Sequence, residues 1–153
     1  MARPLPLLES PDELRRRTWI QLVRTVSLLQ RRIAATLAAR DVTLPQFDVL
    51  ATLRFNEGQT QQELAGRLLV TKGNVCGVLN RLEALGWVER RADPGDKRAN
   101  RLHLTPAGRR RIETLLPEHD ALVVKTLGVL PDSAVKSLRK ALEGLEWAVE
   151  ARA

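Results

Sequence analysis

The sequence predicts a mainly α-helical fold with one small β-hairpin. Apolar residues recur at helical spacing over most of the chain, capping residues divide that pattern into six segments, and one stretch alternates as strands do. The 153 residues are 44% apolar and 28% charged, which suits a folding unit with a sizeable core. We therefore expect one continuous unit with three regions, residues 1–42, 43–105 and 106–153.

The first region is predicted to be one long helix from about Pro11 to Arg40. Its inner positions recur every three or four residues and arginine dominates the opposite face, which is the pattern of an amphipathic helix. Residues 41–43 interrupt the pattern and end the helix. The inner positions are Leu14, Thr18, Leu22, Val26, Leu29, Ile33 and Leu37.

Two short helices are expected next. Thr43 and Pro45 suit the cap and the first turn of a helix that ends near Arg54. Thr60 and Glu63 form a capping box, in which each side chain satisfies a backbone donor at the start of the following helix. The residues predicted to face the core are Phe47, Leu50 and Leu53 in the first helix and Leu64, Leu68 and Leu69 in the second.

A fourth helix is predicted from the cap at Thr71 to about Leu85, and Gly86 ends it. One face of this helix is apolar and is assigned to the core, whereas the exposed face is small or polar. The apolar positions are Val75, Val78, Leu79 and Leu82, and the exposed positions are Thr71, Lys72, Asn74, Gly77, Asn80 and Arg81.

A β-hairpin follows the fourth helix. Residues 87–90 and 100–104 alternate as half-buried strands do, and residues 93–96 between them have the composition of a turn. The chain then returns to helix, with Thr105 and Pro106 as cap and first turn and a bend expected at Pro117.

A sixth helix is predicted to start at Pro131 and Asp132. Its apolar residues form a narrow seam at alternating spacings of three and four, the pattern that paired helices use. The seam consists of Val135, Leu138, Leu142, Leu145 and Val149.

The order of these elements is that of a winged helix-turn-helix, in which the second of two closely spaced helices enters the DNA major groove. The formal net charge of +7 implies an acidic partner. Aromatic residues make up only 3% of the chain, which disfavours readers of RNA and single strands, because these stack bases on aromatic side chains. Double-stranded DNA is the expected partner.

The sequence resembles the MarR family of transcriptional regulators. The resemblance runs from about Thr43 to Gly108, with compatible helices on both sides. Its most specific part is DPGDKR at 93–98 followed by LHLT at 102–105, which is similar to the wing of that family. The segment LEALGWV at 82–88 is similar to the exit of its recognition helix.

The resemblance implies that Arg98 inserts into the minor groove while Asp96 orients a nearby arginine. Narrow minor grooves concentrate negative potential, and residues 90–101 carry five basic against two acidic side chains. In the fourth helix, Thr71 is equally explained as a cap alone and Arg81 as an ion-pair partner. The expected DNA-binding residues are Thr71, Lys72, Asn74, Arg81, Asp96, Lys97 and Arg98.

A homodimer on a pseudo-palindromic operator is also expected, because two copies double the contact made by one short helix and one wing. The first, fifth and sixth helices carry more apolar surface than a small winged-helix module can cover, and the resemblance implies pairing through such helices. A monomer with an internal helical subdomain is the alternative. Dimerisation is assigned to Leu14, Leu22, Leu138, Leu142 and Leu145.

The resemblance further implies a small phenolic or anionic effector between the dimer helices and the DNA-binding lobe. Trp19, Phe47, Asp48 and Arg54 lie on segments that would border that crevice, although core packing explains Trp19 and Phe47 equally well. The expected function is a repressor that a small ligand releases from DNA. DNA binding without an effector is an alternative.

The sequence has no residue pattern typical of a metal-binding protein, a disulfide-linked protein or an enzyme. A single cysteine and two distant histidines, His103 and His119, offer neither an internal disulfide nor a zinc site, and we expect no cofactor. Cys76 is assigned to the fourth helix as a small buried residue, with a reactive thiol as the alternative. No nucleophile with its base, carboxylate pair or phosphate loop is found, so we do not expect an enzyme.

A winged helix that binds a protein is the remaining rival. Its exposed face would be apolar or acidic, where this one is basic. Neither a signal-type leader nor a run of about 18 apolar residues occurs in the sequence, so we expect a cytoplasmic location and no membrane partner.

Overall fold

The computed structural model describes residues 10–96 and 99–151. Over these residues the fold is mainly helical with one antiparallel two-stranded hairpin, which confirms the predicted fold class. The elements are α1 (Pro11–Ala38), α2 (Leu44–Phe55), α3 (Gln61–Arg67), α4 (Lys72–Ala84), β1 (Val88–Ala92), β2 (Asn100–Leu104), α5 (Pro106–Leu127) and α6 (Asp132–Glu150).

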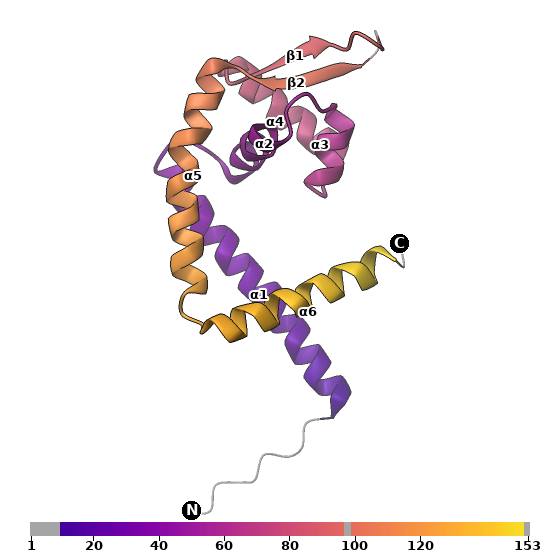
Figure 1. Ribbon diagram of the computed structural model, residues 1–153, viewed down its shortest axis with the longest axis vertical. Helices are drawn as coiled ribbons and strands as arrows, with labels where there is room; N and C mark the ends of the chain where they lie inside the picture. Colours follow the sequence, from indigo (N-terminus) through magenta and orange to yellow (C-terminus); the bar gives the residue numbers. More distant parts are fainter. Residues whose placement is uncertain (1–9, 97–98, 152–153) are drawn as a thin grey trace, which may run out of the picture.

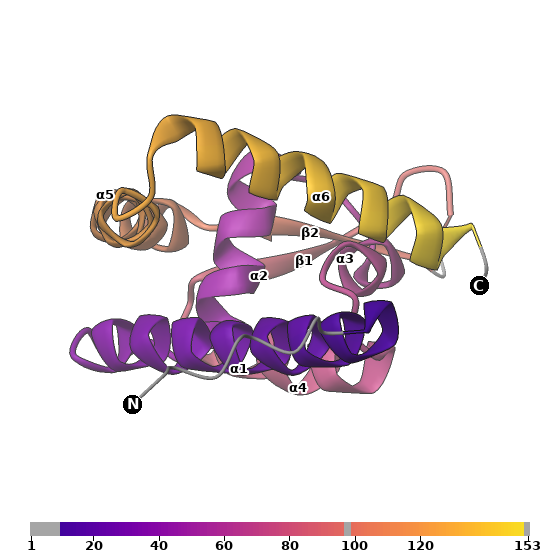
Figure 2. The same ribbon diagram turned by 90° about the horizontal axis from the view of Figure 1, so that it is seen from below.

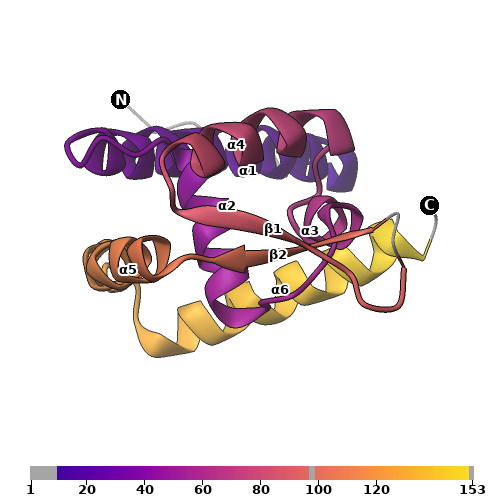
Figure 3. The ribbon, with the colours of Figure 1, turned by 90° about the horizontal axis from the view of Figure 1, so that it is seen from above.

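The elements form a compact lobe and a set of long helices. In Figure 1, α2, α3, α4 and the hairpin gather at one end, and α5 runs from the hairpin to the other end, where α6 turns back. Figure 2 shows α1 and α6 as two separate rods on opposite sides of the view from below. From above, the hairpin reaches outward past α3 (Figure 3).

Threonine caps start four of these helices, as the sequence predicts for each. Each hydroxyl accepts a hydrogen bond from the backbone N–H three residues on, which satisfies a donor that the helix itself leaves unpaired. Thr60 and Glu63 close the predicted capping box, and Thr43 closes a second one with Gln46. The cap positions are Thr43, Thr60, Thr71 and Thr105.

The core lies inside the lobe and at its junction with α1 and α5. The inward residues predicted for α2 are buried, and so is Leu64 of α3. The prediction for Leu69 is wrong, because its side chain is 87% exposed. This residue has φ +53° in the turn between α3 and α4, where its N–H donates to the Gly66 carbonyl, and this conformation directs the side chain outward.

Strand β1 begins one residue later and ends two residues later than predicted. It pairs with β2 in a register that sets Val88 opposite Leu104 and Ala92 opposite Asn100. The base of this hairpin is held to the start of α5. The Thr105 hydroxyl donates to the Gly86 carbonyl at 2.6 Å, and the Thr105 N–H donates to the Trp87 carbonyl at 3.1 Å. The two segments lie so close that a Cβ on Gly108 would stand 1.9 Å from the Trp87 carbonyl oxygen. Only glycine therefore fits at position 108.

Candidate nucleic-acid interface

The predicted contact residues on α4 share one exposed face. Val75, Leu79 and Leu82 are buried against the lobe, and the positions between them face away from it. The start of α4 is fixed to α3, because the Gln61 side-chain amide donates to the Lys72 carbonyl at 3.2 Å. The residues that the structure leaves exposed include Thr71, Lys72, Asn74, Asn80 and Arg81.

Two glycines, Gly73 and Gly77, lie on the same exposed face of α4. A Cβ added at either position would meet no atom within 4 Å among the described residues, so packing inside the chain does not require glycine there. Glycine inside a helix costs about 1 kcal/mol relative to alanine. The pair leaves a smooth helical surface on which a partner's backbone can approach closely.

One arginine of the hairpin links β1 to α4. Arg90 of β1 forms an ion pair with Glu83 and donates to the Asn80 side-chain oxygen at 3.1 Å. Both acceptors belong to α4, so Arg90 ties the wing to the predicted recognition helix. The hydrogen bond from Arg90 orients the Asn80 amide, whose nitrogen keeps its two N–H donors for an external partner.

A second arginine organises the other strand. Arg101 Nε donates to the Asp93 carboxylate at 2.5 Å, and its Nη1 donates to the Gly58 carbonyl at 3.1 Å. Asp93 also accepts from the Gly95 N–H at 2.7 Å. The Gly95 N–H and then Arg101 lower the pKa of Asp93, so this carboxylate stays ionised and closes the hairpin turn.

The base of the wing is held by Glu57, which lies between α2 and α3. Its carboxylate accepts from Arg109 at 2.6 Å and from the Leu104 N–H at 3.2 Å, and His103 Nδ1 lies 3.6 Å away. Partial burial raises the pKa of Glu57, but the hydrogen bond and charge of Arg109 and the Leu104 N–H outweigh it, so the net pKa is lowered.

The wing and the start of α4 enclose a polar hollow of about 420 Å³. The structure thereby brings together Lys72 and Asp96, two of the predicted DNA-binding residues, with Arg90 beside them. The other two predicted wing residues, Lys97 and Arg98, lie outside the described residues.

Sequence reasoning missed the residues that position this surface. The sequence alone predicts no role in holding the hairpin for Glu57, Arg90 or Arg101, and it predicts Asp93 only as part of a turn. In the structure all four form ion pairs that hold the hairpin in place. One signal was available, since an Asp two residues before Gly at a turn is suited to accept the backbone N–H that Asp93 accepts. The other partnerships join residues up to 52 positions apart, which no local pattern reveals.

The four predicted effector residues lie in different surroundings in the described part of the chain. Trp19 is 64% exposed on α1, whereas Phe47 is buried and stacks on His119 with ring centroids 4.8 Å apart. Arg54 forms an ion pair with Glu113 of α5. Asp48 lines a separate hollow between α2 and α4.

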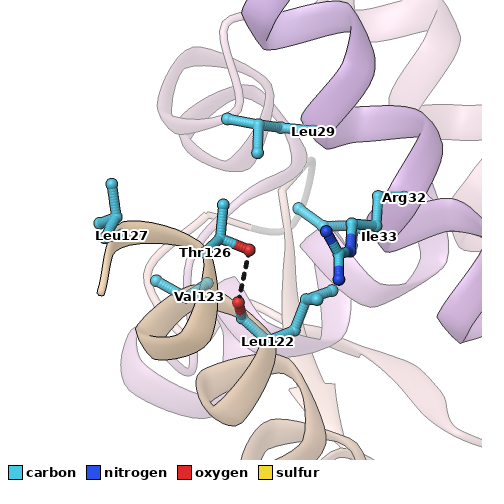
Figure 4. Close-up of a pocket in the computed structure, with 7 residues that line it drawn as sticks. All are labelled: Leu29, Arg32, Ile33, Leu122, Val123, Thr126 and Leu127. Atoms are coloured by element: carbon cyan, nitrogen blue, oxygen red, sulfur yellow. Dashed lines mark hydrogen bonds between the residues drawn. The ribbon is translucent and has the colours of Figure 1, made fainter. Parts of the chain in front are cut away.

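A small apolar pocket lies between α1 and α5 (Figure 4). It measures about 130 Å³, enough for one ring-sized group, and the guanidinium of Arg32 stands at its edge. Its other lining residues are Leu29, Ile33, Leu122, Val123, Thr126 and Leu127.

The long helices expose most of the apolar side chains that were assigned to dimerisation. None of the described α6 residues is buried, and Leu37 is the buried residue of α1. The exposed fractions are 55% for Leu14, 41% for Leu138, 42% for Leu142 and 46% for Leu145, and Leu22 is half-buried.

Residues 10–96 and 99–151 contain neither a clustered metal-ion site nor a membrane-spanning helix. No group of three or more His, Cys, Asp or Glu side chains in this part of the chain could hold a metal ion. No helix there is both long and apolar enough to cross a bilayer. Cys76 is half-buried in α4, so it is less enclosed than the sequence predicted.

The amino-acid sequence of the chain is similar to those of known transcriptional regulators. The model of the MarR family matches residues 40–99. A helix-turn-helix transcriptional regulator of Bacillus cereus is 35% identical over 100 residues, which cover 65% of this chain and 66% of that protein. The multiple antibiotic resistance protein MarR of Salmonella typhimurium is 40% identical over 72 residues, or 47% of this chain and 50% of that protein.

Solved structures extend the similarity to most of the chain. A mutant MarR from E. coli is 30% identical, with a TM-score of 0.69 over 82% of this chain and 93% of that chain. The same mutant in complex with operator DNA is 29% identical, with a TM-score of 0.74 over 84% of this chain and 95% of that chain.

Proposed function

The chain belongs to the MarR family of winged helix-turn-helix transcriptional regulators, and we propose that it is a repressor that binds a pseudo-palindromic operator as a homodimer. We propose further that a small ligand releases it from DNA. The observation that carries the proposal is the fixed arrangement of α4 and the hairpin, which presents a small-residue helix face beside an arginine-rich wing.

In this proposal α4 enters the major groove. Asn74 and Lys72 lie near its start, where a recognition helix meets base edges and phosphates. The glycines allow close approach. Thr71 caps the helix, because its hydroxyl accepts from the Asn74 N–H, and it either contacts a phosphate as well or only holds the helix in place. Arg81 is exposed and forms no ion pair with the described residues, so its guanidinium is assigned to a phosphate contact. Asp96, Lys97 and Arg98 form the tip of the wing, which is assigned to the minor groove.

The homodimer is proposed from the uncovered apolar seam of α6 and the apolar side chains of α1. Leu138, Leu142 and Leu145 stand on one face of α6 at coiled-coil spacing and are each about two-fifths exposed. A monomeric protein rarely leaves such a stripe in water, whereas a second copy would cover it.

We propose a small effector without assigning its site to the four residues that the sequence suggested. Those residues lie apart in the single chain, so a shared pocket would need the partner subunit. We also propose that the protein has no enzymatic activity and works in the cytoplasm, where the DNA of a bacterial-type regulator is found. Both proposals follow from the regulator family to which the chain belongs.

The test is a binding titration of the purified protein on a labelled duplex taken from the DNA just upstream of its own gene. A scrambled duplex of the same length and composition is the control, and both are titrated from 50 to 200 mM salt. Neutralised phosphates release counterions, so we expect binding to the upstream duplex to weaken by about 10³-fold or more across this range.

The upstream duplex should also bind at least about 10³-fold more tightly than the scrambled one at physiological salt. Binding that shows no salt dependence would contradict a phosphate-contacting interface and favour a protein partner for the wing. Equal affinity for the two duplexes would contradict recognition of that operator.

A further inference from the structure

A hollow of about 360 Å³ lies between α2 and α4, beside the proposed recognition face. This volume falls in the range of small-molecule sites, which runs from about 300 to 1,000 Å³. Its walls are mainly apolar, and they come from α2 on one side and from α4 and the turn before it on the other. The lining residues are Pro45, Asp48, Val49, Leu68, Val70, Asn74, Val75 and Val78.

Among the described residues that line this hollow, Asp48 is the one with a charged side chain. Its carboxylate accepts no hydrogen bond and forms no ion pair with any described residue, although it is half-buried. Burial raises the pKa of Asp48, and attraction to His119 offsets this only in part. A half-buried carboxylate that accepts no hydrogen bond is unfavourable for folding, and carboxylates with such a raised pKa are common at binding sites.

The chemistry of the hollow indicates its ligand. Apolar walls favour a hydrocarbon or aromatic body, and one unpaired carboxylate favours a single cationic nitrogen. An anionic ligand would meet repulsion from Asp48, and a DNA phosphate would meet the same repulsion. The hollow therefore differs in charge preference from the basic interface beside it.

We propose that this hollow binds a small organic cation with an apolar body, whose ammonium or amidinium group pairs with Asp48, and that binding of the cation lowers the affinity of the protein for DNA. The second part rests on the function proposed above. Asn74 lines the hollow and also belongs to the proposed DNA-binding face, so one side chain borders both ligands. A ligand that contacts Asn74, Val75 and Val78 changes the setting of α4 relative to α2.

The test uses three probes of one shape: benzylammonium, neutral benzyl alcohol and anionic benzoate. Binding to the full-length protein without DNA is measured by isothermal titration calorimetry at neutral pH. We expect benzylammonium to bind most tightly and benzoate least. Asp48→Asn should weaken benzylammonium binding by about ten- to hundredfold, the range for a hydrogen-bonded charge, while benzyl alcohol binding changes less than about twofold.

Two further variants control for indirect effects. Asp132→Asn removes one exposed carboxylate from the first turn of α6, away from the hollow, and should leave benzylammonium binding unchanged. Val78→Phe fills the hollow from α4 and should weaken both benzylammonium and benzyl alcohol. Circular dichroism of each variant checks that the fold is retained. Equal binding of the three probes, or unaltered benzylammonium binding by folded Asp48→Asn, would overturn the proposed site.

The effect of the cation on DNA binding is measured separately, as release of the upstream duplex when benzylammonium is added. Release by wild type but not by Asp48→Asn is expected. Probe binding without any specific duplex binding would leave the cation site standing and would contradict the proposed function instead. Duplex binding that saturating benzylammonium does not weaken would overturn the coupling of the hollow to α4.

Discussion

The DNA-binding lobe and the long helices differ in how far they bury their apolar side chains. Most core residues lie between positions 43 and 105, with Leu50, Leu64 and Leu102 among the fully buried ones. Most of the large apolar side chains that stay exposed lie on α1, α5 and α6. The lobe is thus complete within one chain, whereas the helices are complete only when another surface covers them.

This difference separates two roles. The interface is positioned by contacts of Arg90 and Arg101 within the lobe and by the ion pair of Glu57 with Arg109 in the first turns of α5. Pairing of two interfaces is assigned to the helices. Substitutions in the two regions should therefore fail in different ways, one by loss of assembly and the other by loss of local structure or geometry.

The largest effect is expected from the α6 seam. Leu138→Glu combined with Leu145→Glu places charges on the proposed dimer face, so dimers should separate and duplex affinity should fall by about 10²- to 10⁴-fold through lost bivalency. Analytical ultracentrifugation and the duplex titration measure the two outcomes. Ser137→Glu, which adds the same charge beside the seam, is the control and should remain dimeric. A double variant that still sediments as a dimer would contradict the assignment.

The next largest effect concerns two glycines, Gly108 in the first turn of α5 and Gly77 on the exposed face of α4. Gly108→Ala sets a Cβ against the Trp87 carbonyl and should lower the free energy of unfolding by at least about 2 kcal/mol. Gly77→Ala meets open space in a helix and should raise it by up to about 1 kcal/mol while weakening duplex binding. Urea denaturation and duplex titration separate these effects. Unchanged duplex binding by Gly77→Ala would contradict close approach at that position.

A smaller effect is expected at Glu57. Its pKa is lowered in the folded state, so its contribution to stability is present above about pH 4.5, the ordinary value, and is lost as the pH falls through the folded-state pKa. Glu57→Gln should be less stable than wild type at pH 7 by about 1 kcal/mol or less, since the carboxylate is partly exposed. Urea denaturation from pH 7 to pH 3 should show the two proteins converge at acid pH. If the free energies of unfolding of the two proteins still differ at pH 3, the shape of the Glu57 side chain, and not its charge, is responsible for the difference in stability.

The smallest effect has the opposite sign and belongs to Asp48. Its pKa is raised in the folded state, so the folded protein holds this proton more tightly and stability falls as the pH rises above about 3.8 through the folded-state pKa. Asp48→Asn should therefore match or exceed wild-type stability at pH 7, by less than about 1 kcal/mol. A clear loss of stability in the same urea series would indicate a structural partner for this carboxylate.

The sequence was sufficient for the elements and for most of the core. Threonine caps, helical periodicity and strand alternation are local signals, and they located the helices and strands of the described residues to within a few residues. Leu69 shows the limit of periodicity, because a left-handed turn reversed the side that the pattern assigned to it.

The candidate site was only partly predictable. The exposed positions of α4 follow from its amphipathic pattern, so Lys72 and Asn74 could be named in advance. The contacts of Arg90 with α4 and of Glu57 with Arg109 depend on how the hairpin folds back on the lobe. The hollow beside Asp48 likewise joins α2 to α4 and exists only in three dimensions.

The central claim is that two identical lobes, paired through the helices, read one duplex. Hydroxyl-radical footprinting of the wild-type protein on the upstream duplex tests it most directly. We expect two symmetric sets of protected positions whose centres are separated by about one helical turn, 10 base pairs, or a multiple of it. A single protected half-site at saturating protein, with no symmetric partner, would contradict a dimeric repressor on a pseudo-palindromic operator.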